Sequence, residues 1–366
     1  MVATDTDRLR PAIHPVYPRL MCAYLHERGF ENDAIFRGTR LQWEQLLGEH
    51  RYLSLEQVSR LERRAVALTG TPWLGLEIGA ATSVSAHGPL GYAVISAPDL
   101  RAVLKVVARF VAVRFQLVEL SFEEDEREGR LTLHEKVDLG DMREFNAGSI
   151  LATYFQLVDT VTSRRLRDAH IQVPFEAPPW AEHYEQRLGC PVTFGADHLA
   201  ITLPKPVLDT PCLTADPGLH RTALRDCEHQ LKQLQSGGPL SQRIGIELLD
   251  GDGQYPTLED MAARFAMSPR TLIRKLKSEG TRYQELLDDV RGELAAWYLL
   301  ETDLPVERIA ERLGYQDPSN FSRTFQRWFG VTPRTMRQSP NKNRSNANTC
   351  SSSAPNSRNA SARFNK

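Results

Sequence analysis

The sequence contains few cysteines, and their arrangement argues against two kinds of stabilising site. Only five occur in 366 residues, and no two form a Cys-x-x-Cys pair. An odd, scattered set argues against a disulfide framework and against a structural zinc site. We therefore expect a reduced chain that resides in the cytoplasm. The cysteines are Cys22, Cys190, Cys212, Cys227 and Cys350.

Long apolar runs and a secretory signal are also missing. The longest apolar stretch, residues 103–115, is interrupted by Lys105, Arg109 and Arg114, so it is too short and too charged to span a bilayer. The first ten residues, MVATDTDRLR, are polar and lack the apolar segment of a secretory signal. We expect no contact with a membrane.

The motifs that mark common catalytic and nucleotide-binding sites do not occur. There is no G-x-G-x-x-G, no P-loop, no H-E-x-x-H and no nucleophile elbow. His183 and Cys190 are close in sequence, but a lone pair of this kind more often packs in a core than catalyses a reaction. The sequence therefore predicts a protein that is not an enzyme and that needs no cofactor or metal ion.

The composition that is present indicates two globular domains with different charge. Hydrophobic residues make up 41% of the chain and charged residues 25%, which is typical of a globular protein with real cores. Residues 254–340 carry 13 basic against 12 acidic residues, and residues 341–366 carry five basic and no acidic residues. The other 253 residues are left with 27 basic against 34 acidic ones, a net charge of −7. An acidic N-terminal part and a mildly basic C-terminal part suggest that the two parts bind different partners.

Two stretches predict where the domains begin and end. Residues 339–366 contain seven Asn and seven Ser, too polar a mixture to build a core, so we expect a disordered tail. A Gly-Gly-Pro sequence at 237–239 is typical of a linker. The predicted organisation is a domain at 1–235, a linker at 236–240, a second domain at 241–338 and the tail.

The front domain mixes helical and strand patterns. Several short helices are expected between residues 15 and 80, with further helices near 98–113 and 143–166. Alternating or β-branched stretches predict strands, and the acidic run at 123–130 reads as a solvated hairpin between two of them. Without strict βαβ alternation, this order favours an α+β fold. The expected strands lie in residues 115–124, 130–139, 169–175 and 199–204.

Ahead of the linker, residues 216–234 predict a helix with an apolar stripe. Leu224, Cys227, Leu231 and Leu234 recur at steps of three and four residues, as in the seam of a short coiled coil. Two interpretations remain open. The stripe packs on its own domain, or it forms the contact of a homodimer.

The second domain contains an internal repeat. TLEDMAARFAMSPRTLIRKLKSEG (257–280) aligns with PVERIAERLGYQDPSNFSRTFQRWFG (305–330). Each unit predicts a helix, a tight turn near Ala266 or Gly314, and a second helix that begins with a capping residue and proline. Because Gly314 tolerates a positive φ and Ala266 does not, the first turn is expected to be strained or different. Two such units form two helix-turn-helix motifs.

The second helix of each unit has one apolar and one polar face. Leu272 and Leu276 in the first unit, and Phe321, Phe325 and Trp328 in the second, are expected to be buried. The outer faces offer arginines and short polar groups, which suit base edges and phosphates of a DNA major groove. The candidate DNA-binding residues are Arg270, Thr271, Arg274, Lys277, Ser319, Asn320, Arg323 and Arg327.

The segment between the units predicts one continuous helix. Residues 281–300 carry an apolar stripe, and twenty helical residues span roughly 30 Å. Successive major grooves on one face of DNA lie roughly 34 Å apart. The connecting helix would therefore allow both second helices to enter neighbouring grooves.

The second domain resembles the AraC/XylS family of bacterial transcription regulators. The resemblance covers residues 243–340 and rests on SPRTLIRKLKSEG and IAERLGYQDPSNFSRTFQRWFGVTPRTMR. It implies an all-α domain that binds promoter DNA with two linked helix-turn-helices, and by position it places Arg270, Arg274, Ser319, Asn320 and Arg323 at base-facing sites. It also implies an activator that acts on RNA polymerase.

The first 240 residues are similar to the effector-sensing domain of ornithine-utilisation-type members, on TGTPWLGLEIGAAT, GPLGYAVISAPDLRAVL and GCPVTFGADHLAITLPKPVLDTP. This implies an unidentified small-molecule effector, and no likeness to the sugar-binding barrel of the founding member is found. The leading hypothesis is an effector-controlled DNA-binding regulator. The alternatives are an enzyme or repair protein that carries such a DNA-binding domain, and an architectural DNA binder without an effector.

Overall fold

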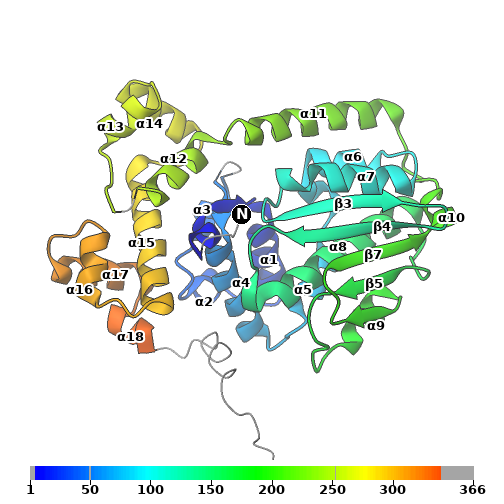
Figure 1. Ribbon diagram of the computed structural model, residues 1–366, viewed down its shortest axis with the longest axis horizontal. Coiled ribbons are helices and arrows are strands. Elements are labelled where there is room, and N and C mark those ends of the chain that lie inside the picture. Colours follow the sequence, from blue (N-terminus) through cyan, green and yellow to red (C-terminus); the bar gives the residue numbers. More distant parts are fainter. Residues whose placement is uncertain (1–4, 49–50, 252, 339–366) are drawn as a thin grey trace, which may run out of the picture.

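The chain folds into an α+β part followed by an all-helical part, which confirms the fold class predicted from the sequence (Figure 1). The computed structural model describes residues 5–48, 51–251 and 253–338. The predicted tail and Cys350 lie outside these residues. The domain boundaries stay a prediction, although one helix ends at Gln235, just before the expected linker, and the next begins at Leu240, its last residue.

Short helices form the beginning of the chain, as the sequence predicts, together with one small strand pair that was not predicted. Ser54 starts the longest of these helices with a capping box, because its hydroxyl accepts from the Gln57 amide while the Gln57 side chain accepts from the Ser54 amide. The elements are η1 (Asp5–Leu9), β1 (Pro11–Ile13), α1 (Val16–His26), α2 (Asn32–Phe36), α3 (Trp43–Leu46), β2 (Leu53–Ser54), α4 (Leu55–Thr69), α5 (Leu74–Ala81), η2 (Val84–His87), α6 (Pro89–Ile95), α7 (Leu100–Phe110) and η3 (Val111–Val113).

A five-stranded sheet follows, in the order β3-β4-β7-β5-β6. All neighbours are antiparallel except β5 and β6. The acidic run is the β3–β4 hairpin, as expected. The strands are β3 (Val118–Glu124), β4 (Glu128–Glu135), β5 (His170–Val173), β6 (Val192–Phe194) and β7 (Leu199–Pro204), and the helices among them are η4 (Gly140–Met142), α8 (Arg143–Thr162), α9 (Glu182–Leu188) and α10 (Lys205–Leu208).

Helix α8 and one face of the sheet enclose the core of this part. Alternate residues of β4, Leu131 and Leu133, are buried against it, which follows from the two-residue period of a strand. Helix α11 (Pro217–Gln235) runs from this part towards the helical part (Figure 1). Its Ala223 and Cys227 are buried in the same core, so the apolar stripe packs on its own domain. A homodimer contact stays untested.

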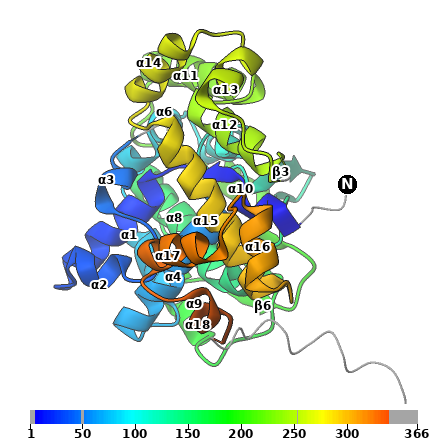
Figure 2. The same ribbon diagram turned by 90° about the vertical axis from the view of Figure 1, so that its left-hand side faces the viewer.

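The helical part contains the two predicted helix-turn-helix units. Its helices are α12 (Leu240–Leu249), α13 (Leu258–Arg264), α14 (Pro269–Ser278), α15 (Tyr283–Glu301), α16 (Val306–Arg312), α17 (Pro318–Phe329) and α18 (Pro333–Gln338). Helix α15 connects the units, with α13 and α14 near one end and α16 and α17 near the other (Figures 1 and 2). The small residues Ala262 and Ala310 are fully buried where each first helix packs.

Most of the residues expected in this core are buried, with one exception. Leu272, Leu276, Phe321 and Phe325 have no more than 1% of their surface exposed. The prediction for Trp328 is wrong in part, because it is only half-buried. Its ring packs at the edge of the core, where the guanidinium of Arg40 lies over it. The local sequence does not reveal this contact.

The two turns have the same backbone geometry although their residues differ. Met267 donates to the Ala262 carbonyl in the first unit, and Tyr315 donates to the Ala310 carbonyl in the second. Both turns need a positive φ, which is 51° at Ala266 and 78° at Gly314. The expected strain at Ala266 is confirmed, since a residue with a Cβ is disfavoured in this region.

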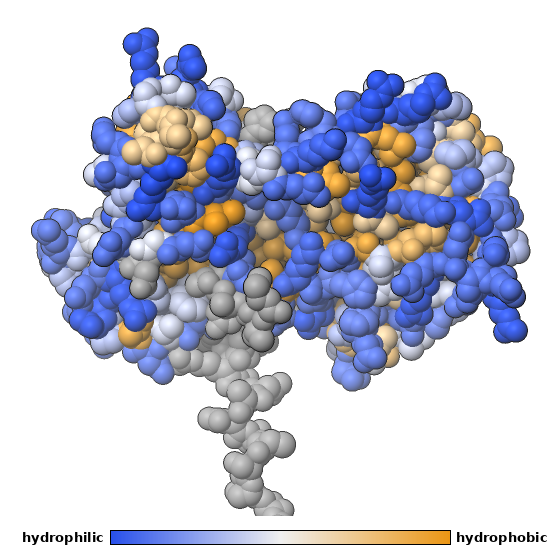
Figure 3. Space-filling model, turned by 45° about the horizontal axis from the view of Figure 1, so that its top comes forward, coloured by the Kyte–Doolittle hydropathy of each residue, from blue (hydrophilic) through white to orange (hydrophobic). Residues whose placement is uncertain are grey.

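The surface is mostly hydrophilic, with patches of hydrophobic residues (Figure 3). Among the described residues, six large hydrophobic side chains are exposed, and one of them lies on the second helix of the first unit. They are Leu47, Tyr92, Leu213, Leu219, Ile273 and Val331.

Replacing Ala266 with glycine should stabilise the protein. The substitution relieves the left-handed strain and adds some entropy to the unfolded chain, so the net gain is about 0.5–1 kcal/mol. Gly314→Ala should do the reverse, because the new Cβ would also lie 3.3 Å from Nη2 of Arg291. Urea unfolding of both variants measures these changes. Equal destabilisation by the two substitutions would contradict this account of the turns.

Candidate nucleic-acid interface and internal cavity

The second helix of each unit begins with the capping interaction that the sequence predicts. The Ser268 hydroxyl accepts from the Thr271 amide at 3.2 Å, and the Asp317 carboxylate accepts from the Ser319 amide at 2.9 Å. Pro269 and Pro318 occupy the first turn of each helix, where a missing N–H costs nothing. These caps fix where α14 and α17 start, and hence which residues point outward.

The eight candidate residues all lie on the outer faces of α14 and α17. Seven are exposed, and Thr271 is half-buried beside its cap. Arg323 donates to Oδ1 of Asn320 at 3.0 Å, which leaves the Asn320 amide N–H groups free to donate elsewhere. The structure therefore gathers donor groups into two stripes, one at each end of α15. Their role in binding stays a prediction.

One further residue on this surface escaped the sequence reasoning. Ile273 is 52% exposed on α14, between Thr271 and Arg274 in the chain. An exposed isoleucine among arginines fits the contact that apolar side chains make with thymine methyl groups. The signal was present, because Ile273 does not share the spacing of Leu272 and Leu276, which form the buried face.

Arg40 joins the front part of the chain to both α15 and α17. Its guanidinium donates to the carbonyls of Asp288 and Asp289 at 2.7 and 3.0 Å and to Glu293 at 3.4 Å. It also lies 4.8 Å from the ring centre of Trp328, close enough for a cation–π interaction. Arg40 has a φ of 66°, so the backbone is strained to present this side chain.

Two more arginines complete this contact, which we call the domain junction (Arg40, Arg51, Arg60, Asp289 and Glu293). Nη2 of Arg60 in α4 donates to both carboxylate oxygens of Glu293, at 2.6 and 2.7 Å. Arg51 pairs with Asp289. Glu293 is only 4% exposed, and a buried carboxylate needs such partners.

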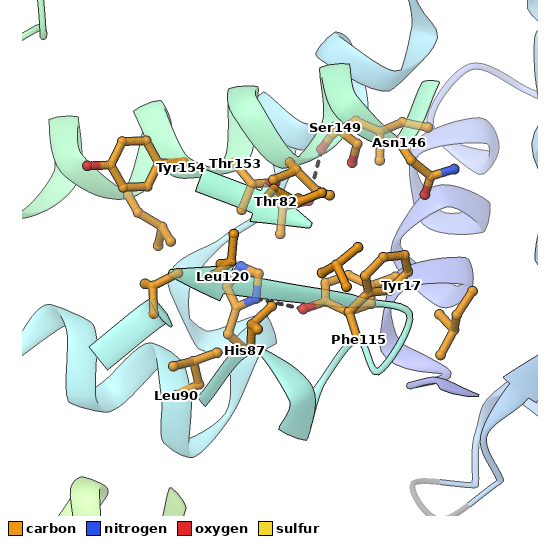
Figure 4. A pocket seen from close by; sticks show the side chains of 18 of the residues that line it. Tyr17, Thr82, His87, Leu90, Phe115, Leu120, Asn146, Ser149, Thr153 and Tyr154 are labelled. Carbon is orange, nitrogen blue, oxygen red and sulfur yellow. Dashed lines mark hydrogen bonds between the residues drawn. The ribbon is translucent and has the colours of Figure 1, made fainter. Parts of the chain in front are cut away.

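A cavity of about 160 Å³ lies inside the front part, between the sheet and the helices α1, α4, α6 and α8 (Figure 4). Its sheet wall consists of inward-facing strand residues, and no lysine or arginine of the described residues lines it. The strand residues are Val118, Leu120, Leu131, Leu133, Leu199 and Ile201.

A few polar groups interrupt these apolar walls. The Tyr17 hydroxyl and Nδ1 of His87 are 3.1 Å apart, and Asn146 donates to Glu62 at 3.2 Å. Burial, assisted by the positive charge of Arg114, lowers the pKa of His87 to about 4. Burial raises the pKa of Glu62 to about 8 against the opposing hydrogen bond from Asn146. Both side chains are therefore mainly uncharged at pH 7.

The residues that line the cavity cannot be recognised in the sequence. They come from segments between residues 13 and 201 and form no motif. The only available signal was the apolar alternation of the strands, which is the same for a filled core and for a wall with empty space behind it.

The described cysteines and His183 are in environments that do not favour catalysis. Burial raises the pKa of the Cys22 and Cys190 thiols to about 12 and that of Cys212 and Cys227 to about 11. A thiol that stays protonated is a poor nucleophile. His183 is stacked on Trp73, with ring centres 3.7 Å apart.

Within the part of the chain that the structure describes, no three His, Cys, Asp or Glu side chains are grouped to hold a metal ion. The helices there are also too short or too polar to cross a membrane.

Two family models match the chain. One, described as the arabinose-binding N-terminal domain of an AraC transcription regulator, covers residues 29–212, and a helix-turn-helix model covers residues 261–339. The expectation that the front part does not resemble the founding member's sugar-binding domain is therefore wrong. In the described structure, β3 to β7 form one five-stranded sheet, and β1 and β2 form a separate pair.

The chain is also similar to curated regulators along nearly its whole length. It is 33% identical over 324 residues to the ornithine utilization regulator of Pseudomonas aeruginosa, covering 88% of this chain and 96% of that one. The regulator VqsM of the same species is 28% identical over 72% of this chain and 83% of its own. The crystal structure of CdpR, also from P. aeruginosa, has a TM-score of 0.45 at 23% identity, with 88% and 98% coverage.

The free energy of unfolding should fall as the pH rises from 6.5 to 8. Glu62 has a raised pKa in the folded state, so the folded protein retains a proton that the unfolded chain releases, and stability is lost through the folded pKa near 8. His87 has the opposite effect, but only between its folded pKa of about 4 and its ordinary value of 6.5. Urea unfolding at both pH values measures this slope.

Glu62→Gln should flatten the slope, because glutamine keeps the hydrogen-bonding shape without a titrating proton. The same substitution at the exposed Glu44 should leave the slope unchanged. Identical slopes for Glu62→Gln and the parent protein would contradict the assignment of Glu62.

Proposed function

The chain belongs to the AraC family of transcription regulators, and we propose that it binds specific promoter sites under the control of a small-molecule effector. The main support for DNA binding is the pair of capped helices, α14 and α17. Their stripes of donor residues are exposed at the two ends of α15. The 19 residues of α15 span about 28 Å, close to the spacing of successive major grooves.

In this proposal some residues of the two stripes contact bases and others contact the DNA backbone. Arg270, Arg274 and Arg323 donate to guanine edges, and Asn320 donates to base acceptors while Arg323 holds its carbonyl. Thr271, Lys277, Ser319 and Arg327 bind phosphate or sugar groups and set the register on the duplex. Ile273 contacts a thymine methyl group.

The effector acts through the front part of the chain, and the domain junction supports this. Helix α4 carries Arg60 at the junction and Glu62 at the cavity, so one helix contacts both sites. A molecule that binds two arrangements of α4 with different affinity would shift the position of α15. The second helices of the two units, α14 and α17, would move with it.

The mode of regulation, the partners and the location of the protein follow from the proposed role as a transcription regulator. We propose an activator that contacts RNA polymerase and works in the cytoplasm, where promoter DNA is found, with a homodimer as the form bound to paired sites. The reading as an enzyme or repair protein is disfavoured by the protonated thiols, and the curated relatives are named transcriptional regulators. An architectural role without an effector would leave the cavity without a purpose.

Arg323→Ala should weaken binding to the preferred site by roughly 1–3 kcal/mol and relax the preference at one or two base pairs. Binding to a randomised DNA pool, followed by sequencing, measures both effects. Arg308→Ala is a matched control, since Arg308 is an exposed arginine of α16 that pairs with Glu311 outside the stripes. An equal loss of affinity for all sequences would identify Arg323 as a phosphate contact instead.

Gly292→Ala should loosen the domain junction without changing any charge. A Cβ at this position would lie 1.9 Å from Nη1 of Arg40, so the guanidinium must leave its site on α15. We expect amide hydrogen exchange in residues 37–42 to become roughly tenfold faster, the equivalent of about 1.4 kcal/mol.

Gly245→Ala in α12 is the control for this substitution, because its new Cβ makes only an ordinary 3.5 Å contact with Pro11. Unchanged exchange in residues 37–42 of Gly292→Ala would show that Arg40 does not hold the junction together.

A further inference from the structure

The internal cavity has the size of a small molecule rather than of a large metabolite. Its volume of about 160 Å³ is close to that of an apolar cavity of about 150 Å³ that holds benzene. Its walls are mainly leucine, isoleucine, valine and aromatic side chains. A molecule of about one aromatic ring, or a short aliphatic chain, would therefore fill it.

His87 presents an unpaired polar atom at this cavity. The side chain is 5% exposed, and no hydrogen-bond partner for its Nε2 is found among the described residues. Leaving a buried polar group unpaired costs about 1–3 kcal/mol. In Figure 4 the ring lies across the cavity from Thr82 and Thr153, with Tyr17 bonded at its side.

The partners of His87 decide which atom carries the proton. Burial keeps the Tyr17 hydroxyl protonated by raising its pKa, and Nδ1 of His87 is the one acceptor found for that hydroxyl in the described chain. Tyr17 therefore donates to Nδ1, and the single proton of the neutral ring lies on Nε2. The unpaired atom is thus a hydrogen-bond donor, and it needs an acceptor.

The cavity offers no compensation for a charged ligand. Among the described residues, the only acidic one that lines it is Glu62, which stays protonated, and Arg114, which donates to the His87 backbone carbonyl, does not line the space. A carboxylate or ammonium group enclosed here would lose its hydration without gaining a counter-charge. An amino acid, which carries both groups, would fit worst.

Building on the regulatory role proposed above, we propose that this cavity is the effector site. Its ligand is an uncharged, largely apolar molecule of about one ring, with a single hydrogen-bond acceptor that receives the Nε2–H of His87. Specificity then comes from two sources, the shape of the apolar walls and this one donor.

A set of matched probes tests the proposal on the full-length protein by calorimetry and thermal shift. Acetophenone has the acceptor, α-methylstyrene has the same shape without it, and benzoate, benzylamine and L-ornithine carry charge. We expect acetophenone to bind about tenfold more tightly than α-methylstyrene and at least a hundredfold more tightly than any charged probe. Binding of a charged probe as tight as that of acetophenone, or no binding of either neutral probe at millimolar concentration, would overturn the proposal.

Two substitutions at one position separate the donor from the cavity. His87→Leu should remove the preference for acetophenone over α-methylstyrene, and His87→Gln, which keeps an N–H donor, should restore part of it. Ser149→Leu, which fills the space, should abolish the binding of both. A preference that persists in His87→Leu would overturn the role of His87.

The same preparations keep this proposal distinct from the proposed function. Sequence-specific DNA binding of the parent protein is measured with and without each probe. If it is present in any of these samples and the neutral probes fail to bind, the ligand class is wrong and the DNA-binding role stands. If it is absent in all of them while the neutral probes bind the cavity, the proposed function itself fails.

Discussion

The arrangement of the two parts of this protein depends on a buried carboxylate, Glu293, in the middle of α15. A carboxylate that is 4% exposed loses its hydration, so it is stable only while Arg40 and Arg60 remain beside it. Both arginines come from the front part of the chain. Gly292 makes room for Arg40 at a helical position where glycine would otherwise be unfavourable by about 0.5–1 kcal/mol relative to alanine. A connecting helix that served only the DNA-binding units would need neither feature.

Helix α4 therefore contacts two separate sites, the cavity and Glu293 of α15. Val58 and Glu62 line the cavity, whereas Arg60 reaches Glu293. Because packed helices transmit displacement rather than absorb it, a ligand that moves α4 changes the geometry of its pair with α15. Coupling between cavity and DNA then requires only that the ligand prefer one of two positions of α4, and the reciprocal effect, of DNA on ligand affinity, must be equal in size.

The sequence allowed the helical part to be predicted almost completely, because its signals are local. Caps at Ser268 and Asp317, the small residues Ala262 and Ala310, and the strained turn at Ala266 all follow from neighbouring residues. The front part was predictable only as a set of helices and strands. Neither the cavity nor Arg40 has a local signal, since each depends on residues that folding brings together from distant segments. Trp328 shows the same limit, as its ring contacts Arg40, which lies 288 residues away in the chain.

The domain junction also changes the charge that the helical part exposes. Residues 254–340 hold 13 basic and 12 acidic residues, a balance that by itself predicts weak attraction to DNA. Asp289 and Glu293, however, are paired with arginines of the front part, which neutralise their negative charge. The candidate DNA-binding arginines of α14 and α17 remain exposed. The exposed surface of the helical part is therefore more basic than its composition suggests, and an isolated helical part, deprived of Arg40, Arg51 and Arg60, would lose this compensation.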